Sequence, residues 1–322
     1  MADTSLFARL VAFIGGVAVA IRHSGDGPRP PVYGTAPAIP VARPQGSIPT
    51  LKMPTARGWE GDHTPAAAPG LRVNAFARGL VHPRNMHVLP NGDVLVAESM
   101  GEAGTPHSLF DHAMHATMKR ARASGESPNR VTLLRDADGD GVAEERHAFI
   151  ENVRQPFGMA LVGDTLYVGA SDAVLAYPYE PGTTRIAAKG RKLMDLKPGG
   201  HWTRNLIASR DGGKLYVAVG SLTNIADEGM EAEIDRACIH ELDLATGTSR
   251  VFAGGLRNPV GMAWEPVGGM LWTVVNERDG LGDETPPDYL TSVRDGGFYG
   301  WPYCYWDRVV DDRVPQDPQL VA

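Results

Sequence analysis

The amino-acid sequence from residue 71 onward predicts an all-β fold built from repeated hairpins. The chain of 322 residues contains 38 Gly and 25 Pro, residues that separate strands by turns more often than they occur inside helices. Short apolar runs rich in Val, Leu and Tyr alternate with Asn-Gly, Asp-Gly and Gly-Gly pairs, which mark hairpin turns. One arrangement recurs along the chain, namely an apolar stretch, a Gly-containing turn and a second apolar stretch.

The N-terminus carries an apolar run, Leu10–Ile21, which is too short to span a bilayer comfortably. Ala18 and Ala20 form a small-residue pair at which a signal peptidase can cut. We therefore expect residues 1–23 to be a signal peptide or membrane anchor, and the protein to be periplasmic or secreted. The alternative is a frayed tail without targeting value.

Residues 24–70 differ in composition from the rest of the chain. They are rich in Pro, Gly, Ala and Thr and show neither helical nor strand periodicity, which is typical of a linker or an extended arm. The strand-like pattern begins at Leu71, so residues 71–322 are predicted to form the folded domain.

Four copies of the hairpin pattern are visible, and they begin at His82, Gln155, His201 and Arg257. Their starts lie roughly 45 to 75 residues apart, which matches a four-stranded propeller blade with insertions. Both strands of each copy are apolar enough to be buried between neighbouring sheets. A closed ring needs more than four blades, so we expect the last blade to be missing or incomplete in this chain.

A segment between the first two hairpin copies, His107–Arg122, has helix-like composition without Gly or Pro, which predicts a helix that decorates a blade loop. Its histidines, His107, His112 and His115, could be read as metal ligands. Exposed histidines are the favoured interpretation.

Charge and motifs exclude several functions. The net charge of −7 argues against a nucleic-acid partner, because such binding depends on Lys and Arg that neutralise phosphates. Cys238 and Cys304 lie far apart without zinc or haem spacing, and whether they pair in a disulfide stays open. Dinucleotide, P-loop and serine-hydrolase motifs are absent from the sequence.

Polar residues open the third and fourth hairpins. His201 is followed by Trp202, Thr203 and Arg204, and Arg257 is followed by Asn258. Positions that open a blade face the central channel of a propeller. A His, an Arg and an Asn there can supply a base, a cation for a developing oxyanion and an orienting amide. A structural His at a strand end is the alternative.

An acidic loop follows the fourth hairpin, within Asn276–Leu290. Its acids are Glu277, Asp279, Asp283, Glu284 and Asp288. Ca²⁺ takes six to eight oxygen ligands, and a bent acidic loop can supply several of them. A solvated acidic turn is the alternative.

A second acidic turn, Asp136–Gly141, begins like an EF-hand loop. Position 12 is His147 and not Glu, so the bidentate closing ligand is missing. An Asp-Gly hairpin turn is therefore the favoured interpretation, with a Ca²⁺ site as the alternative.

These motifs carry a family resemblance. The segments GGHWTRNL from Gly199, GLRNPVGMAW from Gly255 and GGFYGWPY from Gly296, together with the first acidic loop, resemble the soluble quinoprotein sugar dehydrogenases, with the sorbosone dehydrogenase type nearest. The likeness runs from about Pro49 to the end of the chain. It implies a six-bladed β-propeller that holds pyrroloquinoline quinone (PQQ) over its channel, with calcium bound to the cofactor.

The resemblance also implies roles for individual residues. His201 matches the general base, and Arg257 and Asn258 match the pair that contacts the quinone oxygens. Glu277, Arg278 and Asp279, located by counting back from Asp283, match the calcium-binding positions, where the carbonyl oxygens of Arg278 and Asp279 would face the metal. The glucose-oxidising members have Gln, Gly and Pro at these three positions, and the family places further Lys and Arg contacts in a last blade.

The resulting hypothesis is a PQQ- and calcium-dependent dehydrogenase that oxidises a sugar aldehyde, hemiacetal or alcohol. Its electrons would pass to a separate acceptor, a cytochrome or a quinone, because this chain has no haem motif. A calcium-dependent sugar lactonase and a non-catalytic binding propeller are the alternatives.

Overall fold

The computed structural model of the protein describes residues 41–43, 58, 59, 61, 63–102, 109–282, 285–306 and 309–317. The predicted signal peptide or anchor, residues 1–23, and most of the predicted arm lie outside the described residues. In the described part the only helices are α2 (Leu109–Arg120) and the short 3₁₀ helix η1 (Met230–Glu233), and all other elements are strands. The all-β prediction is confirmed.

The strands form successive antiparallel sheets in which chain order and spatial order coincide. The first sheet contains β1 (Pro83–Val88), β2 (Val94–Glu98), β3 (Arg130–Arg135) and β4 (Glu145–Glu151). The second contains β5 (Met159–Val162), β6 (Thr165–Ala170), β7 (Ala173–Pro178) and β8 (Arg191–Asp195). The third contains β9 (Leu206–Ala208), β10 (Lys214–Val219), β11 (Cys238–Asp243) and β12 (Ser249–Gly254). The fourth contains β13 (Asn258–Trp264), β14 (Leu271–Asn276) and β15 (Tyr289–Val293).

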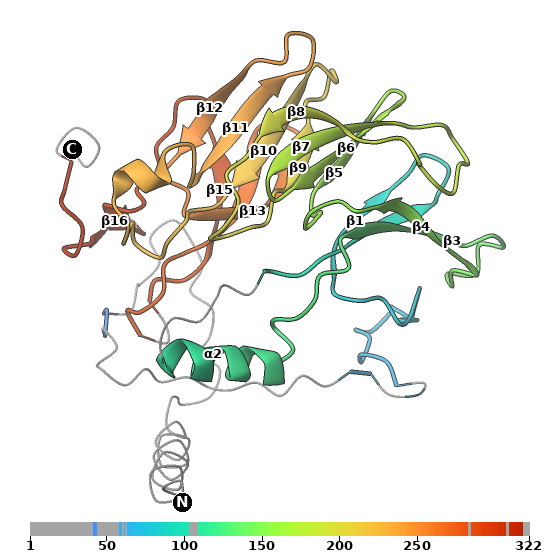
Figure 1. Ribbon diagram of the computed structural model, residues 1–322, viewed down its shortest axis with the longest axis horizontal. Helices are drawn as coiled ribbons and strands as arrows, with labels where there is room; N and C mark the ends of the chain where they lie inside the picture. The colour runs from blue at the N-terminus through green and yellow to red at the C-terminus, as the bar shows by residue number, and fades with distance from the viewer. Residues whose placement is uncertain are drawn as a thin grey trace, which may run out of the picture.

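The four sheets are arranged as propeller blades. Figure 1 shows them following one another in an arc, from β1–β4 through β5–β8 and β9–β12 to β13–β15. Contacts between blades join β1 to β5, β5 to β9, and β9 and β10 to β13, so the first strand of each blade lies nearest the axis. A two-stranded sheet, β16 (Cys304–Tyr305) with β17 (Val309–Val310), follows the fourth blade. The propeller is confirmed with four blades.

Each predicted hairpin forms the first two strands of a blade, in the order expected. In the first, the Asn-Gly pair makes the turn between β1 and β2. Gly92 has φ +91, a left-handed conformation that glycine adopts without steric cost, and Asn91 donates to Asp93 at 2.7 Å. The local turn chemistry therefore agrees with the fold.

The hydrophobic core consists of three clusters, each between two successive blades. They are centred on Leu133 and Val168, on Val174 and Val217, and on Ile239 and Val275. Apolar side chains on both faces of a sheet are buried when a neighbouring sheet covers each face.

One expectation about the core is wrong. The first hairpin was expected to have two buried strands, but in β1 Met86 is 68 % exposed and Val88 is 65 % exposed. Their face of the first blade points away from the second blade, and the described residues place no further sheet against it. Leu290 on β15 of the fourth blade is likewise 61 % exposed.

The predicted helical insertion is confirmed as α2, between β2 and β3. Lys119 and Arg120 occupy its last turn, where cations interact favourably with the helix dipole. His112 is exposed and His115 is half-buried, and neither joins a cluster of metal-ligating side chains among the described residues. No helix in the described ranges has the length and apolar character that crossing a bilayer requires.

Candidate active site

His201 lies in the loop between β8 and β9, at the inner end of the third blade. Its backbone N–H donates to the carbonyl oxygen of Ser221 at 3.0 Å. Its ring Nδ1 lies 2.9 Å from the same oxygen and 3.1 Å from Ser221 Oγ. A carbonyl oxygen only accepts, so Nδ1 carries the ring proton and Nε2 keeps its lone pair. The loop thus presents an imidazole that is able to accept a proton at Nε2.

The electrostatic surroundings of His201 favour this neutral form. Burial, and next the positive charge of Arg257, lower the pKa of His201 below its ordinary value of 6.5. At neutral pH the ring is therefore uncharged, as a general base must be before it acts.

Arg257 is only 4 % exposed and is held by the loops around it. Its Nη1 donates to the Glu277 carbonyl oxygen at 2.6 Å, and its Nη2 donates to Asn224 Oδ1 at 2.8 Å and to Asp279 Oδ2 at 3.0 Å. The Arg257 carbonyl oxygen accepts from Ser221 N–H at 2.7 Å. Ser221 therefore contacts both His201 and Arg257 and fixes their relative positions.

Asn258 completes the group. It is 8 % exposed, its Nδ2 lies 3.4 Å from Asn276 Oδ1, and its Oδ1 is buried without a hydrogen-bond partner. Gly220 separates it from His201, because a Cβ at Gly220 would lie 2.4 Å from Asn258 Oδ1 and 2.5 Å from His201 Cβ. The structure thus brings His201, Arg257 and Asn258 together, with an unsatisfied acceptor that a ligand donor can use.

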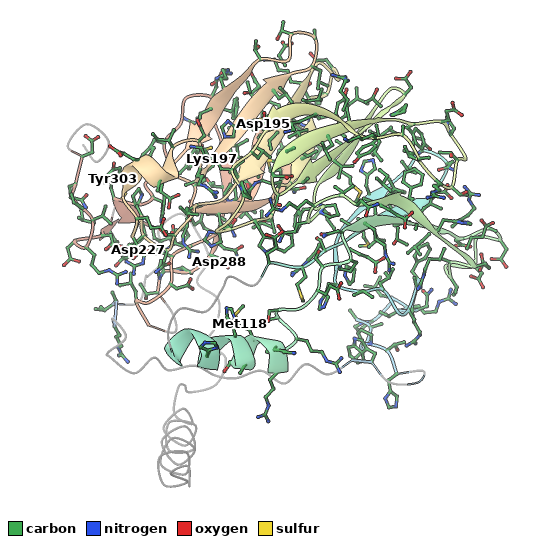
Figure 2. The ribbon with its side chains drawn as sticks, in the orientation of Figure 1. Met118, Asp195, Lys197, Asp227, Asp288 and Tyr303 are labelled. Atoms are coloured by element: carbon green, nitrogen blue, oxygen red, sulfur yellow. The ribbon has the colours of Figure 1, made fainter. Side chains whose placement is uncertain are left out.

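The acids of the first acidic loop do not converge in the described part of the chain. Glu277 is 6 % exposed, and burial raises its pKa to about 7. Asp288 accepts from Asn276 Nδ2 at 2.8 Å and from Glu277 N–H at 2.9 Å; it is labelled in Figure 2. The side chain of Asp279 is 85 % exposed. Asp283 and Glu284 lie outside the described residues.

Arg278 has a buried side chain that forms an ion pair with buried Asp311. It also donates to the Asp279 carbonyl oxygen through Nε at 3.1 Å and Nη2 at 2.8 Å. Asn224 Nδ2 donates to that same oxygen at 3.0 Å. The Asp279 carbonyl oxygen, expected to face a metal, thus has three donors, which a cation would have to replace.

Asn224 is a residue that the sequence motifs did not single out. Besides its contacts with Arg257 and Asp279, it accepts from Trp301 Nε1 at 3.1 Å through its carbonyl oxygen. Glu233 anchors the same loop by accepting from Leu222 N–H at 2.7 Å and Thr223 N–H at 2.9 Å. The sequence signal that could have identified Asn224 is its position in the third hairpin. Asn224 follows the second strand, β10, just as His201 precedes the first strand, β9.

The second acidic turn joins β3 to β4, as the hairpin interpretation requires. The carboxylates of Asp136, Asp138, Asp140 and Glu144 come within 4.8 Å of one another. Both Asp136 oxygens accept backbone N–H groups, from Gly139 at 2.7 Å and Gly141 at 2.8 Å. The turn is therefore organised by its own hydrogen bonds, and a Ca²⁺ site there stays an untested alternative.

The sequence profile of the TrAA12-like family matches residues 125–317. This span contains the second half of the first blade, the whole of the other three blades, and every residue of the group described above. The chain belongs to the TrAA12-like family. The resemblance to quinoprotein sugar dehydrogenases is thereby confirmed. Cys238 and Cys304 of this TrAA12-like chain are not joined by a disulfide bond.

Curated proteins are similar to this TrAA12-like chain in sequence. A curated relative from Hypocrea jecorina, named as a PQQ-dependent sugar dehydrogenase, is 26% identical over 271 residues, which cover 75% of this chain and 57% of the relative. The chain thus spans little more than half of that relative.

Solved structures give the same result for the fold. The calcium structure of the Trichoderma reesei carbohydrate-active enzyme of family AA12 matches with a TM-score of 0.60 and 22% identity, covering 76% of this chain and 63% of that one. The holo form of the pyranose dehydrogenase PQQ domain from Coprinopsis cinerea matches with a TM-score of 0.58 and 21% identity, covering 79% and 62%.

Proposed function

We propose that this protein is a PQQ- and calcium-dependent dehydrogenase that oxidises a sugar. The observation that carries the proposal is the arrangement of His201, whose Nε2 is the free acceptor, beside buried Arg257 and the unsatisfied Oδ1 of Asn258. The name of the Hypocrea jecorina relative supports the same activity.

The described residues fit the proposed cofactor in their chemistry. Arg257 and Asn258 would hold PQQ, because a buried guanidinium and the Nδ2 amide donor of Asn258 suit quinone oxygens that gain charge, while Asn258 Oδ1 would accept from a donor group of the ligand. For calcium, the Glu277 carboxylate and the Arg278 carbonyl oxygen are suitable hard ligands, and no donor contacts that carbonyl in the described part of the chain. When bound, PQQ supplies a two-electron acceptor for the substrate's hydride.

The protein side of the reaction follows from the geometry. His201 would take the proton of the substrate hydroxyl at Nε2 while Nδ1–H stays on the Ser221 carbonyl oxygen, which keeps the ring oriented. Arg257 is held by Glu277, Asn224 and Asp279, so its charge is in place before the reaction. The resulting imidazolium would be disfavoured by burial and by Arg257, so it would release its proton readily.

The finer features are part of the proposal. The substrate would be an aldose or a sugar aldehyde of the sorbosone kind, and a separate cytochrome or quinone would receive the electrons. The complete propeller would have six blades, and residues 1–23 would direct export or tether the protein to a membrane.

Reconstitution tests the function. The purified chain is incubated with PQQ and Ca²⁺, and reduction of an artificial dye is followed with a panel of aldoses and sugar aldehydes. The proposal expects dye reduction that depends on both additions. Hydrolysis of sugar lactones without PQQ, or neither activity in a chain that carries the complete ring, would contradict it.

The substitution His201→Gln tests the base. It removes the proton acceptor and keeps a polar side chain of similar size, so turnover should fall by roughly two to four orders of magnitude. PQQ binding, measured by absorbance or fluorescence titration, should stay within a few-fold of the unmodified protein. Unchanged turnover would exclude His201 as the base.

A further inference from the structure

The loop that carries His201 has an unusual way of satisfying its backbone. We define the His201 loop as Lys197–Thr203, between β8 and β9. Guanidinium groups, rather than strand partners, donate to its carbonyl oxygens. The acceptors are the carbonyls of Lys197, Pro198, Gly199, His201 and Thr203.

Arg204 supplies the first guanidinium. It is 0 % exposed, its Nη1 lies 2.6 Å from the His201 carbonyl oxygen, and its Nη2 lies 2.8 Å from that of Lys197. The Arg204 carbonyl oxygen accepts from Gly158 N–H of the second blade at 2.9 Å. A Cβ at Gly169 would lie 2.2 Å from that same oxygen, so two glycines let the second blade close onto Arg204. Its backbone is thus fixed to one blade while its side chain holds the loop.

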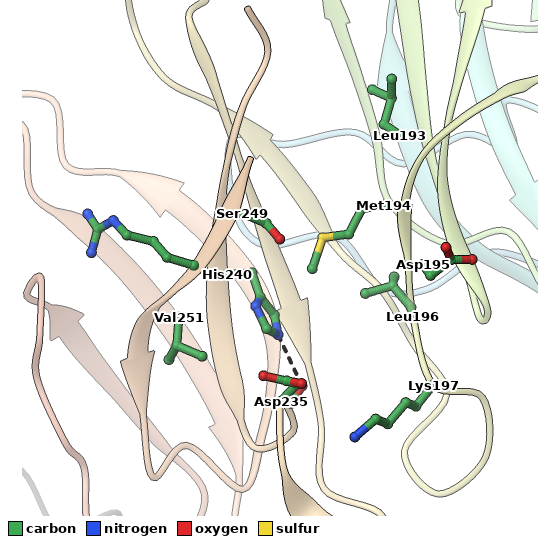
Figure 3. A pocket seen from close by; sticks show the side chains of 10 residues that line it. Leu193, Met194, Asp195, Leu196, Lys197, Asp235, His240, Ser249 and Val251 are labelled. Carbon is green, nitrogen blue, oxygen red and sulfur yellow. Dashed lines mark hydrogen bonds between the residues drawn. The ribbon is translucent and has the colours of Figure 1, made fainter. Parts of the chain in front are cut away.

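Arg236 supplies the second guanidinium from the segment after η1. It is 6 % exposed and donates through Nη2 to the Lys197 carbonyl oxygen at 2.7 Å and through Nη1 to that of Gly199 at 3.2 Å. Lys197 Nζ donates in return to the Ile234 carbonyl oxygen at 2.9 Å. Figure 3 shows Lys197 and Asp235 at one end of a cavity of about 360 Å³ between β8 and the β11–β12 hairpin. Lys197, the first residue of the His201 loop, is one of the residues that line this cavity.

Both arginines are buried without a carboxylate within ion-pair distance among the described residues. Burial, and next the charge of Arg236, lower the pKa of Arg204 to about 9, and burial also lowers the pKa of Arg236. A buried cation without a counter-ion is destabilising unless fixed dipoles compensate it. Every hydrogen bond that the two guanidinium groups make in the described chain goes to a carbonyl oxygen of the His201 loop, and both groups donate to that of Lys197. This indicates that their purpose is the loop conformation.

We propose that Arg204 and Arg236 are positioning residues that hold the His201 loop, so that Nε2 of His201 stays beside Arg257 and Asn258. The inference rests on the proposed function in one respect, namely that His201 is the base. Neither arginine touches the reacting atoms.

The first test needs neither cofactor nor substrate. Arg204→Lys and Arg236→Lys keep the charge and remove the forked geometry. Arg210→Lys is the matched control, since Arg210 also donates to a carbonyl, that of Glu265 at 2.7 Å, but is exposed and outside the loop. The His201 ring is titrated by NMR in the cofactor-free proteins, and its signal is assigned by its loss in His201→Gln.

The expected result is a rise of the His201 pKa toward 6.5 in both loop variants and no change in the control. When the loop is no longer held in place, water can reach the His201 ring, and burial away from water is the largest cause of the low His201 pKa. The charged groups that act on the ring, Arg257, Asp279 and Glu233, are untouched by the substitutions. An unchanged His201 pKa in a folded Arg236→Lys protein overturns the proposal. If Arg204→Lys does not fold, the result for Arg236→Lys alone decides the test.

The second test uses the reconstituted enzyme. Arg236→Lys should lower kcat by roughly tenfold to a hundredfold, because small misplacements of a reacting group cost that much, and should leave KM nearly unchanged. In the His201→Gln background the same substitution should have little further effect. Equal losses in both backgrounds would overturn the positioning role. If no sugar is oxidised at all, the NMR titration still decides the loop proposal separately.

Discussion

His201 shows how one buried ring acquires a defined protonation state. The Ser221 carbonyl oxygen holds the proton at Nδ1, and burial beside Arg257 disfavours a second proton. The ring is therefore prepared to accept a proton from substrate without first having to lose one.

The lowered pKa of His201 predicts the pH profile of the reaction. Because the base must be neutral, kcat/KM should rise with pH, and the midpoint of this rise should lie below pH 6.5, the pH at which an ordinary histidine is half protonated. The measurement is dye reduction at low sugar concentration from pH 4 to 8. In Arg236→Lys the rising limb should move to higher pH, whereas a limb at or above 6.5 in the unmodified enzyme would contradict the assignment.

At the scale of an element, the third blade supplies both sides of the site. The His201 loop enters β9, and the segment Ser221–Asn224 leaves β10. Because β9 and β10 are antiparallel neighbours, the start of one and the end of the other meet at the same edge. Gly220 lies at this junction.

The substitution Gly220→Ala tests how closely that junction is packed. The added Cβ would lie 2.4 Å from Asn258 Oδ1 and 2.5 Å from His201 Cβ, distances at which one of them must move. We expect a stability loss of about 1–3 kcal/mol and a larger loss of turnover than of sugar binding.

Gly213→Ala in the same hairpin is the control, because its Cβ would meet the Asp211 carboxylate, with the nearest atom, Oδ1, at an ordinary 3.5 Å. Thermal unfolding and steady-state kinetics of both variants give the comparison. Full activity of Gly220→Ala would show that the junction has more room for a side chain than the structure indicates.

At the scale of the whole molecule, the site is assembled from the third and fourth blades and the loops between them. The core clusters between blades fix those loops relative to one another. The backbone N–H of Arg43, from the predicted arm, donates to the Leu281 carbonyl oxygen at 2.7 Å, so a distant segment also meets the acidic loop.

Glu277 links this assembly to the stability of the whole chain. Its pKa is raised from 4.5 to about 7, so between these values the folded state binds more protons than the unfolded state. Its contribution to the unfolding free energy is therefore present below about pH 4.5 and is lost as pH rises through 7. The full difference is about 3 kcal/mol.

The substitution Glu277→Gln should remove this loss. In metal-free buffer, the unfolding free energy measured with urea should be higher for the variant than for the unmodified protein at pH 8. At pH 5 the two unfolding free energies should be nearly equal. Added Ca²⁺ should narrow the difference at pH 8, because a bound cation favours the ionised carboxylate. Parallel pH dependences of the two proteins would show that Glu277 is not the group responsible.

The amino-acid sequence by itself determined the hairpins, the helical insertion and the family, because turn residues and strand periodicity are local signals. It also indicated His201, Arg257 and Asn258, since each opens a blade. Only the tertiary structure decided that Asn224 joins Arg257 to Asp279, that β1 has an exposed face, and that Arg204 and Arg236 hold the His201 loop. Those facts depend on which segments meet across blades, and no local pattern in the chain encodes such long-range contacts.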